Sequence, residues 1–218
     1  MELAFLAEAS IHYPVLIAFV IAATALAISP GPDNIFVLTQ SISKGSRAGL
    51  ATACGLVVGC LVHTSLLAFG VSEIIKRSEP LFFGIKLFGS LYLLFLALKV
   101  FKGDDRILLN GKREASRSPY RLFLTGFAMN VLNPKVAIFF LAFFPGFLFS
   151  ETLGTVVQFY VLGLLFMICA LLVFGTIALL AGQISKYIKV RPKAGLWLKW
   201  IQITVLVGIA IYLLLSGK

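Results

Sequence analysis

The feature that most constrains this chain is a series of six apolar blocks, each of roughly 20 residues or more. Of its 218 residues, 60% are hydrophobic and only 13% are charged, whereas a soluble domain carries roughly a quarter charged residues. Each block is long enough to cross a bilayer as a helix, and too long and too uniformly apolar for a barrel strand. The blocks cover residues 14–40, 48–71, 81–101, 122–149, 153–183 and 196–216. We therefore predict an all-α membrane protein with six transmembrane helices in one domain, 1–218, whose partner is the lipid bilayer.

The basic residues between the blocks predict how the chain is oriented. The net charge is +10, but the charges occupy short connections and form no face for nucleic acid. Fourteen Lys and Arg residues lie in the first, third and fifth connections, and three lie in the remaining connections and the termini. By the positive-inside rule the first group is cytoplasmic, so both termini are expected outside. The leader carries Glu2 and Glu8 and no basic residue, so no cleavable signal peptide is expected.

Two of the blocks are interrupted by proline. The first block breaks at Ser29–Asn34 and the fourth at Asn133–Lys135, where missing N–H groups and ring clashes unwind a helix. Three helices on each side of the long basic connection mean that the second half enters the membrane upside down. We predict a 3+3 inverted repeat with broken first and fourth helices. Its parts are repeat one (1–102), a cytoplasmic basic linker (103–120) and repeat two (121–218).

Asp33 is the candidate acid. It is the one carboxylate of nine that lies inside an apolar block, where an unpaired charge costs roughly 2.5–3.5 kcal/mol. The adjoining motif residues form the rest of this candidate site: Pro30, Gly31, Pro32 and Asn34. The alternative is a plain proline kink in which Asp33 caps the second half-helix.

Lys135 is the candidate base, because it lies about fourteen residues into the fourth block, too deep to snorkel easily. Asn133 before it suits an N-cap and Pro134 suits the first helical position. We expect Asp33 and Lys135 to meet near the midplane, since paired broken helices point to a transport site. The alternative is a buried ion pair that only holds the halves together.

The remaining polar residues in the blocks give weaker signals. His63 continues a four-residue spacing from Ala51, Gly55 and Gly59, which predicts a small-residue packing stripe; His63 is then either a packing residue or a proton relay. Asn130 and Gln158 have no geometry that the sequence assigns. No metal cluster, phosphate loop or nucleophile constellation appears, so we expect neither an enzyme nor a cofactor.

The string Ile28–Asn34, early in a six-helix chain, resembles the lysine-exporter (LysE/RhtB) family, and Asn133-Pro134-Lys135 fits the same family. The resemblance covers essentially the whole chain. It implies efflux of amino acids or close derivatives across the bacterial inner (plasma) membrane, driven by proton antiport. Its partners would then be an amino-acid substrate and protons, with both termini periplasmic or extracellular.

Three other functions stay open on the sequence. A membrane thiol–disulfide electron carrier needs paired cysteines near the breaks, and we expect Cys54, Cys60 and Cys169 to lie elsewhere. Efflux of another small solute or a metal ion could use the same scaffold. A non-transporting membrane subunit would gain nothing from unwound helices. The sequence chooses neither among amino acids nor between a monomer and a homo-oligomer.

Overall fold

The computed structural model describes residues 11–72, 79–103, 118–191 and 193–215. The first half contains α2 (Tyr13–Ile28), α3 (Pro32–Lys44), α4 (Ser46–Leu66) with a π-helical turn η1 (Leu67–Val71), and α6 (Glu79–Lys102). The second half contains α7 (Pro119–Val131), α8 (Pro134–Phe143) with a 3-10 turn η2 (Phe144–Phe147), α9 (Thr155–Leu179), α10 (Ala181–Val190) and α11 (Ala194–Leu215). The expected linker 103–120 falls almost wholly outside the described residues.

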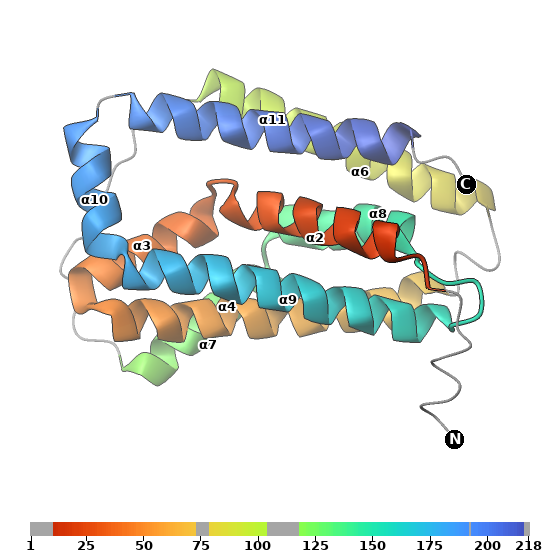
Figure 1. Cartoon of the computed structure of the whole chain (residues 1–218), viewed down its shortest axis with the longest axis horizontal. Helices are drawn as coiled ribbons and strands as arrows, with labels where there is room; N and C mark the ends of the chain where they lie inside the picture. Colours follow the sequence, from red (N-terminus) through yellow and green to blue (C-terminus); the bar gives the residue numbers. More distant parts are fainter. Residues whose placement is uncertain (1–10, 73–78, 104–117, 192, 216–218) are drawn as a thin grey trace.

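Both predicted breaks are present. α2 and α3 meet at a bend of 57°, and α7 meets the α8–η2 segment at a bend of 53°. In the described part of the chain, four helices are long and apolar enough to cross a membrane, and each bent pair supplies one more span. α2–α3 and α7–α8 run in opposite directions along the molecule (Figure 1). The predicted all-α membrane fold with broken first and fourth helices is confirmed.

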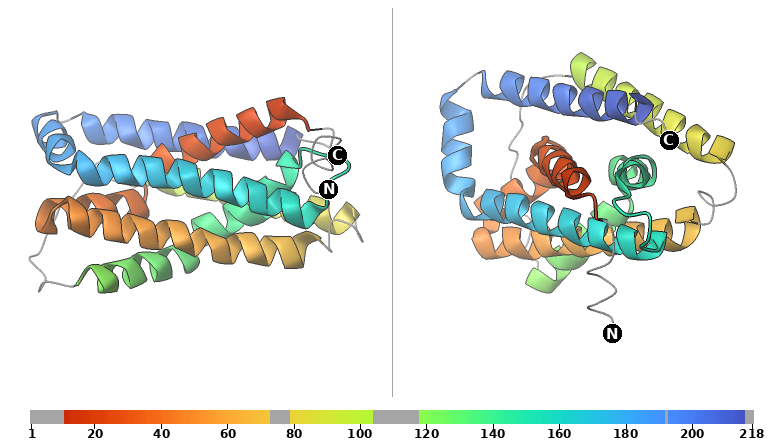
Figure 2. Two further views of the ribbon diagram at one scale, coloured as in Figure 1. Left: turned by 60° about the horizontal axis from the view of Figure 1, so that its bottom comes forward. Right: turned by 45° about the vertical axis from the view of Figure 1, so that its right-hand side comes forward.

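The helices form three layers. α6 and α11 lie side by side in one outer layer, and α4 and α9 lie in the other, with α7 against α4 (Figures 1 and 2). α2 and α8 occupy the space between them, seen almost end-on in the right panel of Figure 2. The breaks at the inner ends of α2 and α8 are only partly enclosed by protein. Ser29, Gly31 and Asp33 are buried, whereas Pro32, Leu132 and Pro134 are exposed. Irregular backbone at membrane depth is tolerated where protein or a water-filled cavity surrounds it.

The small-residue stripe of α4 faces α7. Gly55 lies against the Phe123 carbonyl and Gly126 lies against the Thr52 carbonyl, with no room for a Cβ atom at either glycine. The two backbones approach reciprocally, as small residues allow in membrane helix pairs. This contact joins α4 of the first half of the chain to α7 of the second half.

Six phenylalanines fill the middle layer toward the ends of α2 and α8 away from the breaks. Phe19 of α2 lies 5.0 Å from Phe144 and 5.4 Å from Phe147, ring centre to ring centre. Each of the six is at most 1% exposed. We call Phe19, Phe139, Phe140, Phe143, Phe144 and Phe147 the phenylalanine cluster. The cluster packs α2, α8 and η2 tightly against one another. Phe166 of α9 extends the cluster through contacts with Phe139 and Phe140.

The fifth block does not continue to residue 183 as one helix. α9 ends at Leu179, and α10 turns away to cross from the α4–α9 layer to the α6–α11 layer (Figure 1). No proline marks this bend in the sequence. At the start of α11, Trp197 is 70% exposed, as an interfacial anchor should be.

Candidate functional site

The first break leaves backbone carbonyl groups at the end of α2 without helical partners, and residues of the Ser29–Asn34 motif donate hydrogen bonds to two of them. The Ser29 N–H donates to the Ala25 carbonyl at 2.9 Å, and the Asn34 side chain donates to the Ala27 carbonyl at 2.8 Å. α3 then begins at Pro32, and its N-cap residue Gly31 contributes no side-chain cap. Asp33 is the second residue of α3 and not its N-cap, so the capping interpretation of Asp33 is wrong.

Asn133 connects the second break to the first. Its side-chain oxygen accepts from the Lys135 N–H at 3.0 Å and caps α8. Its amide nitrogen donates to both carboxylate oxygens of Asp33, at 3.3 and 3.1 Å. One amide side chain therefore caps the start of α8 and binds the carboxylate of α3, across 100 residues of sequence.

Lys135 shares a cavity with Asp33 without forming an ion pair with it. Within the described residues, no Asp33–Lys135 nitrogen–oxygen contact lies within the 4.0 Å that defines a salt bridge. The Lys135 ammonium lies beside Gly31 instead, 3.5 Å from where a Cβ atom of that residue would be. The expected meeting of acid and base is thus mediated by Asn133, and Lys135 faces the start of α3.

We call this shared cavity the polar chamber. It has a volume of about 30 Å³, close to that of one water molecule. The residues that line it are Leu26, Ala27, Gly31, Pro32, Asp33, Asn34, Cys60, Asn130, Lys135, Val136, Phe166, Ala170 and Phe174. Asn130 is among these residues, but its side-chain oxygen is buried against Gly59 of α4, without a hydrogen-bond partner. The Asp33 carboxylate in a space of this size suits a cationic guest about as large as water.

The sequence did not predict that Asn130 and Cys60 line the polar chamber. Asn130 was noted only as a polar residue three positions before a break, and Cys60 was expected to lie away from both breaks. The structure places the Cys60 sulfur 3.6 Å from the Asn130 amide nitrogen. The contact could not be read from the sequence, because it depends on the close approach of α4 and α7.

His63 lies apart from the chamber lining. Its Nε2 is 3.1 Å from the Asn130 carbonyl oxygen, and its ring centre is 5.5 Å from that of Phe140. His63 therefore touches the site through Asn130 and the phenylalanine cluster. Pro30 borders the larger cavity described next, and Pro134 starts α8.

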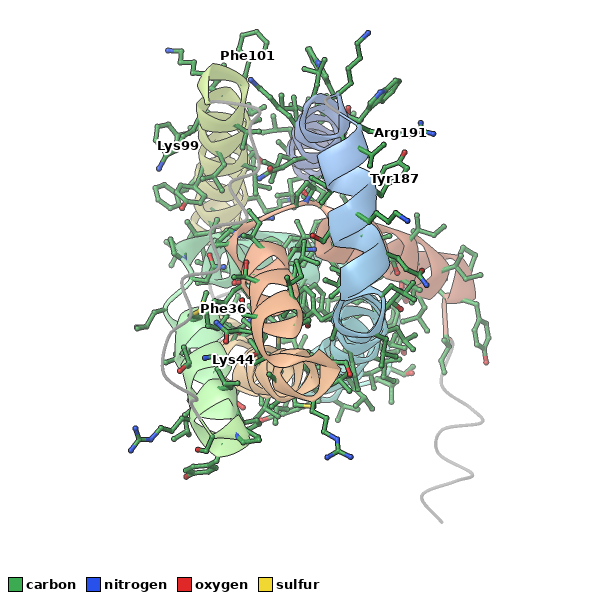
Figure 3. The ribbon with its side chains drawn as sticks, turned by 90° about the vertical axis from the view of Figure 1, so that its left-hand side faces the viewer. Phe36, Lys44, Lys99, Phe101, Tyr187 and Arg191 are labelled. Carbon is green, nitrogen blue, oxygen red and sulfur yellow. The ribbon has the colours of Figure 1, made fainter. Side chains whose placement is uncertain are left out.

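A second, larger cavity of about 990 Å³ adjoins the polar chamber. We call it the inner cavity. It lies between α3 and α9 on one side and α6, α10 and α11 on the other, and it shares Gly31, Pro32 and Asn34 with the chamber. It extends to the end of the molecule that Figure 3 faces. Lys44 of α3, Lys99 of α6 and Arg191, which follows α10, lie at that end. The phenylalanine cluster closes the opposite side of the breaks.

The comparisons with known proteins agree with this architecture. The family model of the LysE type translocator matches residues 24–217. The chain belongs to the LysE type translocator family. The resemblance carried by the two proline motifs is thereby confirmed, and the protein is a membrane translocator and not an enzyme.

Several members of this translocator family match over much of their length. The homoserine/homoserine lactone efflux protein of Salmonella typhimurium is 30% identical over 172 residues, 79% of this chain and 82% of that protein. The leucine efflux protein of Salmonella choleraesuis is 27% identical over 178 residues, 80% of this chain and 82% of that protein. An uncharacterized membrane protein of Pseudomonas aeruginosa is 32% identical over 133 residues, 59% of this chain and 62% of that protein. No solved structure matches significantly.

Two alternative chemistries find no matching arrangement in the part of this translocator that the structure describes. Cys54, Cys60 and Cys169 are free thiols, whereas a thiol–disulfide carrier needs a reactive pair. Among the described residues, no group of three or more His, Cys, Asp or Glu side chains could hold a metal ion.

Proposed function

We propose that this protein exports amino acids or close derivatives from the cytoplasm through the two breaks. The observation that carries the proposal is the Asp33–Asn133 contact, which joins the two broken half-helices at a cavity also lined by Lys135. Efflux proteins for homoserine, its lactone and leucine among the relatives support an amino-acid substrate.

The substrate's head group is divided between two sets of partners. Its ammonium group, about as large as a water molecule, enters the polar chamber, where the Asp33 carboxylate accepts its hydrogen bonds. The unpaired Asn130 oxygen accepts a further one when the amide turns away from Gly59. Its carboxylate lies at Gly31, between the Lys135 ammonium and the uncapped first turn of α3. A helix N-terminus and a lysine both favour an anion.

Proton antiport supplies the driving force. Asp33 takes either the substrate ammonium or a proton, so protonation from outside releases substrate and lets the empty carrier return. The described conformation, with its cavity at the basic end and a closed phenylalanine cluster, is the inward-facing state of this cycle. The excess of basic residues at that end supports a cytoplasmic location and periplasmic or extracellular termini in a bacterial inner membrane.

The test is transport by purified protein in proteoliposomes, with labelled amino acids and an imposed pH gradient. Asp33→Asn removes the charge but keeps a side chain that Asn133 can contact. We expect it to lower gradient-driven transport by roughly 10- to 100-fold, as expected for losing a charged hydrogen-bond partner. Glu151→Gln is the matched control, because Glu151 is an exposed carboxylate outside the site. Full gradient-dependent transport by Asp33→Asn would remove Asp33 from the mechanism.

A further inference from the structure

The walls of the inner cavity constrain the side chain of the substrate. Because this cavity shares Gly31, Pro32 and Asn34 with the polar chamber, a molecule whose head group occupies the breaks projects its side chain into the cavity. Its volume of about 990 Å³ is far more than any amino-acid side chain needs. The chemistry of the walls, more than their spacing, therefore selects the side chain.

The lining is predominantly aliphatic on every side. Ile35 and Leu38 come from α3, Val173 and Ile177 from α9, Ile184 from α10 and Leu198 from α11. Apolar side chains gain roughly fourfold in affinity for each methylene group that they remove from water. A polar or charged side chain would instead lose water contacts against walls that return few hydrogen bonds.

The charges near the cavity disfavour a cationic side chain. None of the described residues that line the inner cavity is acidic, and the one lining lysine, Lys199, is positive. Lys199 is already bound, since its ammonium donates to the Gly103 carbonyl at 2.7 Å. A second cation in the cavity would therefore find no carboxylate, and an anionic side chain would find one ammonium that already donates one of its three N–H groups.

We infer that the substrate is a zwitterionic amino acid with an aliphatic, uncharged side chain, held by its head group at the breaks and by its side chain in the inner cavity. The inference rests on the proposed function and narrows it to one substrate class. It excludes lysine and arginine, and it ranks homoserine below an apolar molecule of the same shape.

The test is competition against counterflow of labelled leucine in proteoliposomes containing the full chain. Two matched pairs supply the controls: norvaline against homoserine, which exchanges a methyl for a hydroxyl, and norleucine against lysine, which adds only an ammonium. We expect potency to rise roughly fourfold per methylene from 2-aminobutyrate to norleucine. Homoserine should be at least about 10-fold weaker than norvaline, and lysine weaker still. Equal potency within either pair overturns the inference.

A matched pair of variants in the wall of the inner cavity tests whether the charge of the wall sets the preference for the substrate side chain. Val173 lines the cavity one position before Phe174 of the polar chamber. Val173→Asp should raise the potency of lysine by about 10-fold, whereas the neutral isostere Val173→Asn should not. If labelled amino acids move but lysine competes as well as norleucine, only this inference fails. If no amino acid moves under any gradient, the proposed function fails with it.

Discussion

Asn130 holds a buried oxygen for which the described structure offers no donor. If this oxygen accepts from the substrate ammonium, Asn130→Leu should weaken binding of a neutral amino acid by roughly 10- to 100-fold, the value of one hydrogen bond to a charged group. The measurement is the half-saturating concentration in proteoliposome counterflow. Cys60→Ala is the control, because it removes the other side-chain contact of Asn130 and leaves the oxygen in place. Equal loss in both variants would assign Asn130 a packing role only.

In contrast to Asn130, Gln158 has a hydrogen-bond partner for each polar atom of its side chain. Its oxygen accepts from the N–H groups of Phe149 and Ser150, and its nitrogen donates to the carbonyls of Ser150 and Leu153. Gln158→Leu leaves these backbone groups unpaired and should cost about 2–4 kcal/mol in unfolding free energy. Denaturant unfolding in detergent would measure this loss. Gln158→Glu, which keeps only the acceptor, should fall between the two. A Leu variant as stable as wild type would contradict this role.

Candidate residues could be predicted from the sequence only where burying the side chain in a membrane costs much free energy. A carboxylate and a lysine deep in apolar blocks are expensive to insert, so Asp33 and Lys135 stood out. Amide side chains cost less to bury and are common in such blocks, so the sequence does not reveal the roles of Asn130 and Gln158. Asn133 was predicted as a cap, and its oxygen is one. Its bond to Asp33 could not be predicted, because it depends on how two half-helices cross.

At the scale of elements, proline marked the breaks because it removes an N–H and blocks the preceding turn. The bend angles of 57° and 53° depend instead on the packing around the breaks. The bend between α9 and α10 has no such marker and was missed. Gly45, whose φ of +87° suits glycine, makes the tight turn between α3 and α4.

The contact between α4 and α7 is the element-level feature with the sharpest prediction. A Cβ atom on Gly126 would overlap the Thr52 carbonyl, so Gly126→Ala must push the helices apart. We expect a loss of about 1–3 kcal/mol in unfolding free energy, in the range of overpacked cores. Gly208→Ala is the control, because nothing lies within 4 Å of a Cβ atom there; it should be neutral or slightly stabilising. Equal stability of the two variants would mean that α4 and α7 do not pack this closely.

The two halves of the whole molecule have the same kinds of helices but not the same packing. α8 packs against α6, with Gly89 directly against Ala142. The corresponding helices of the other half are α3 and α11, and the inner cavity separates them. In an inverted repeat, exchanging the two arrangements yields the opposite-facing state. α3 would then close on α11, while α8 would leave α6 and open the phenylalanine cluster.

This exchange predicts a cross-link that forms only during the transport cycle. Leu38 of α3 and Leu198 of α11 line opposite walls of the inner cavity. With Cys54, Cys60 and Cys169 replaced by alanine, Leu38→Cys combined with Leu198→Cys should form a disulfide in the presence of an added thiol oxidant when substrate and a pH gradient drive cycling. The Cβ atoms of the two cysteines must come within about 4.5 Å of each other to form this bond. The disulfide therefore holds the protein in the state in which the inner cavity is closed, and it abolishes counterflow until a reductant is added. Each single variant should transport without oxidant sensitivity. If both cysteines react with maleimide and yet never cross-link during active transport, α3 and α11 do not close on each other.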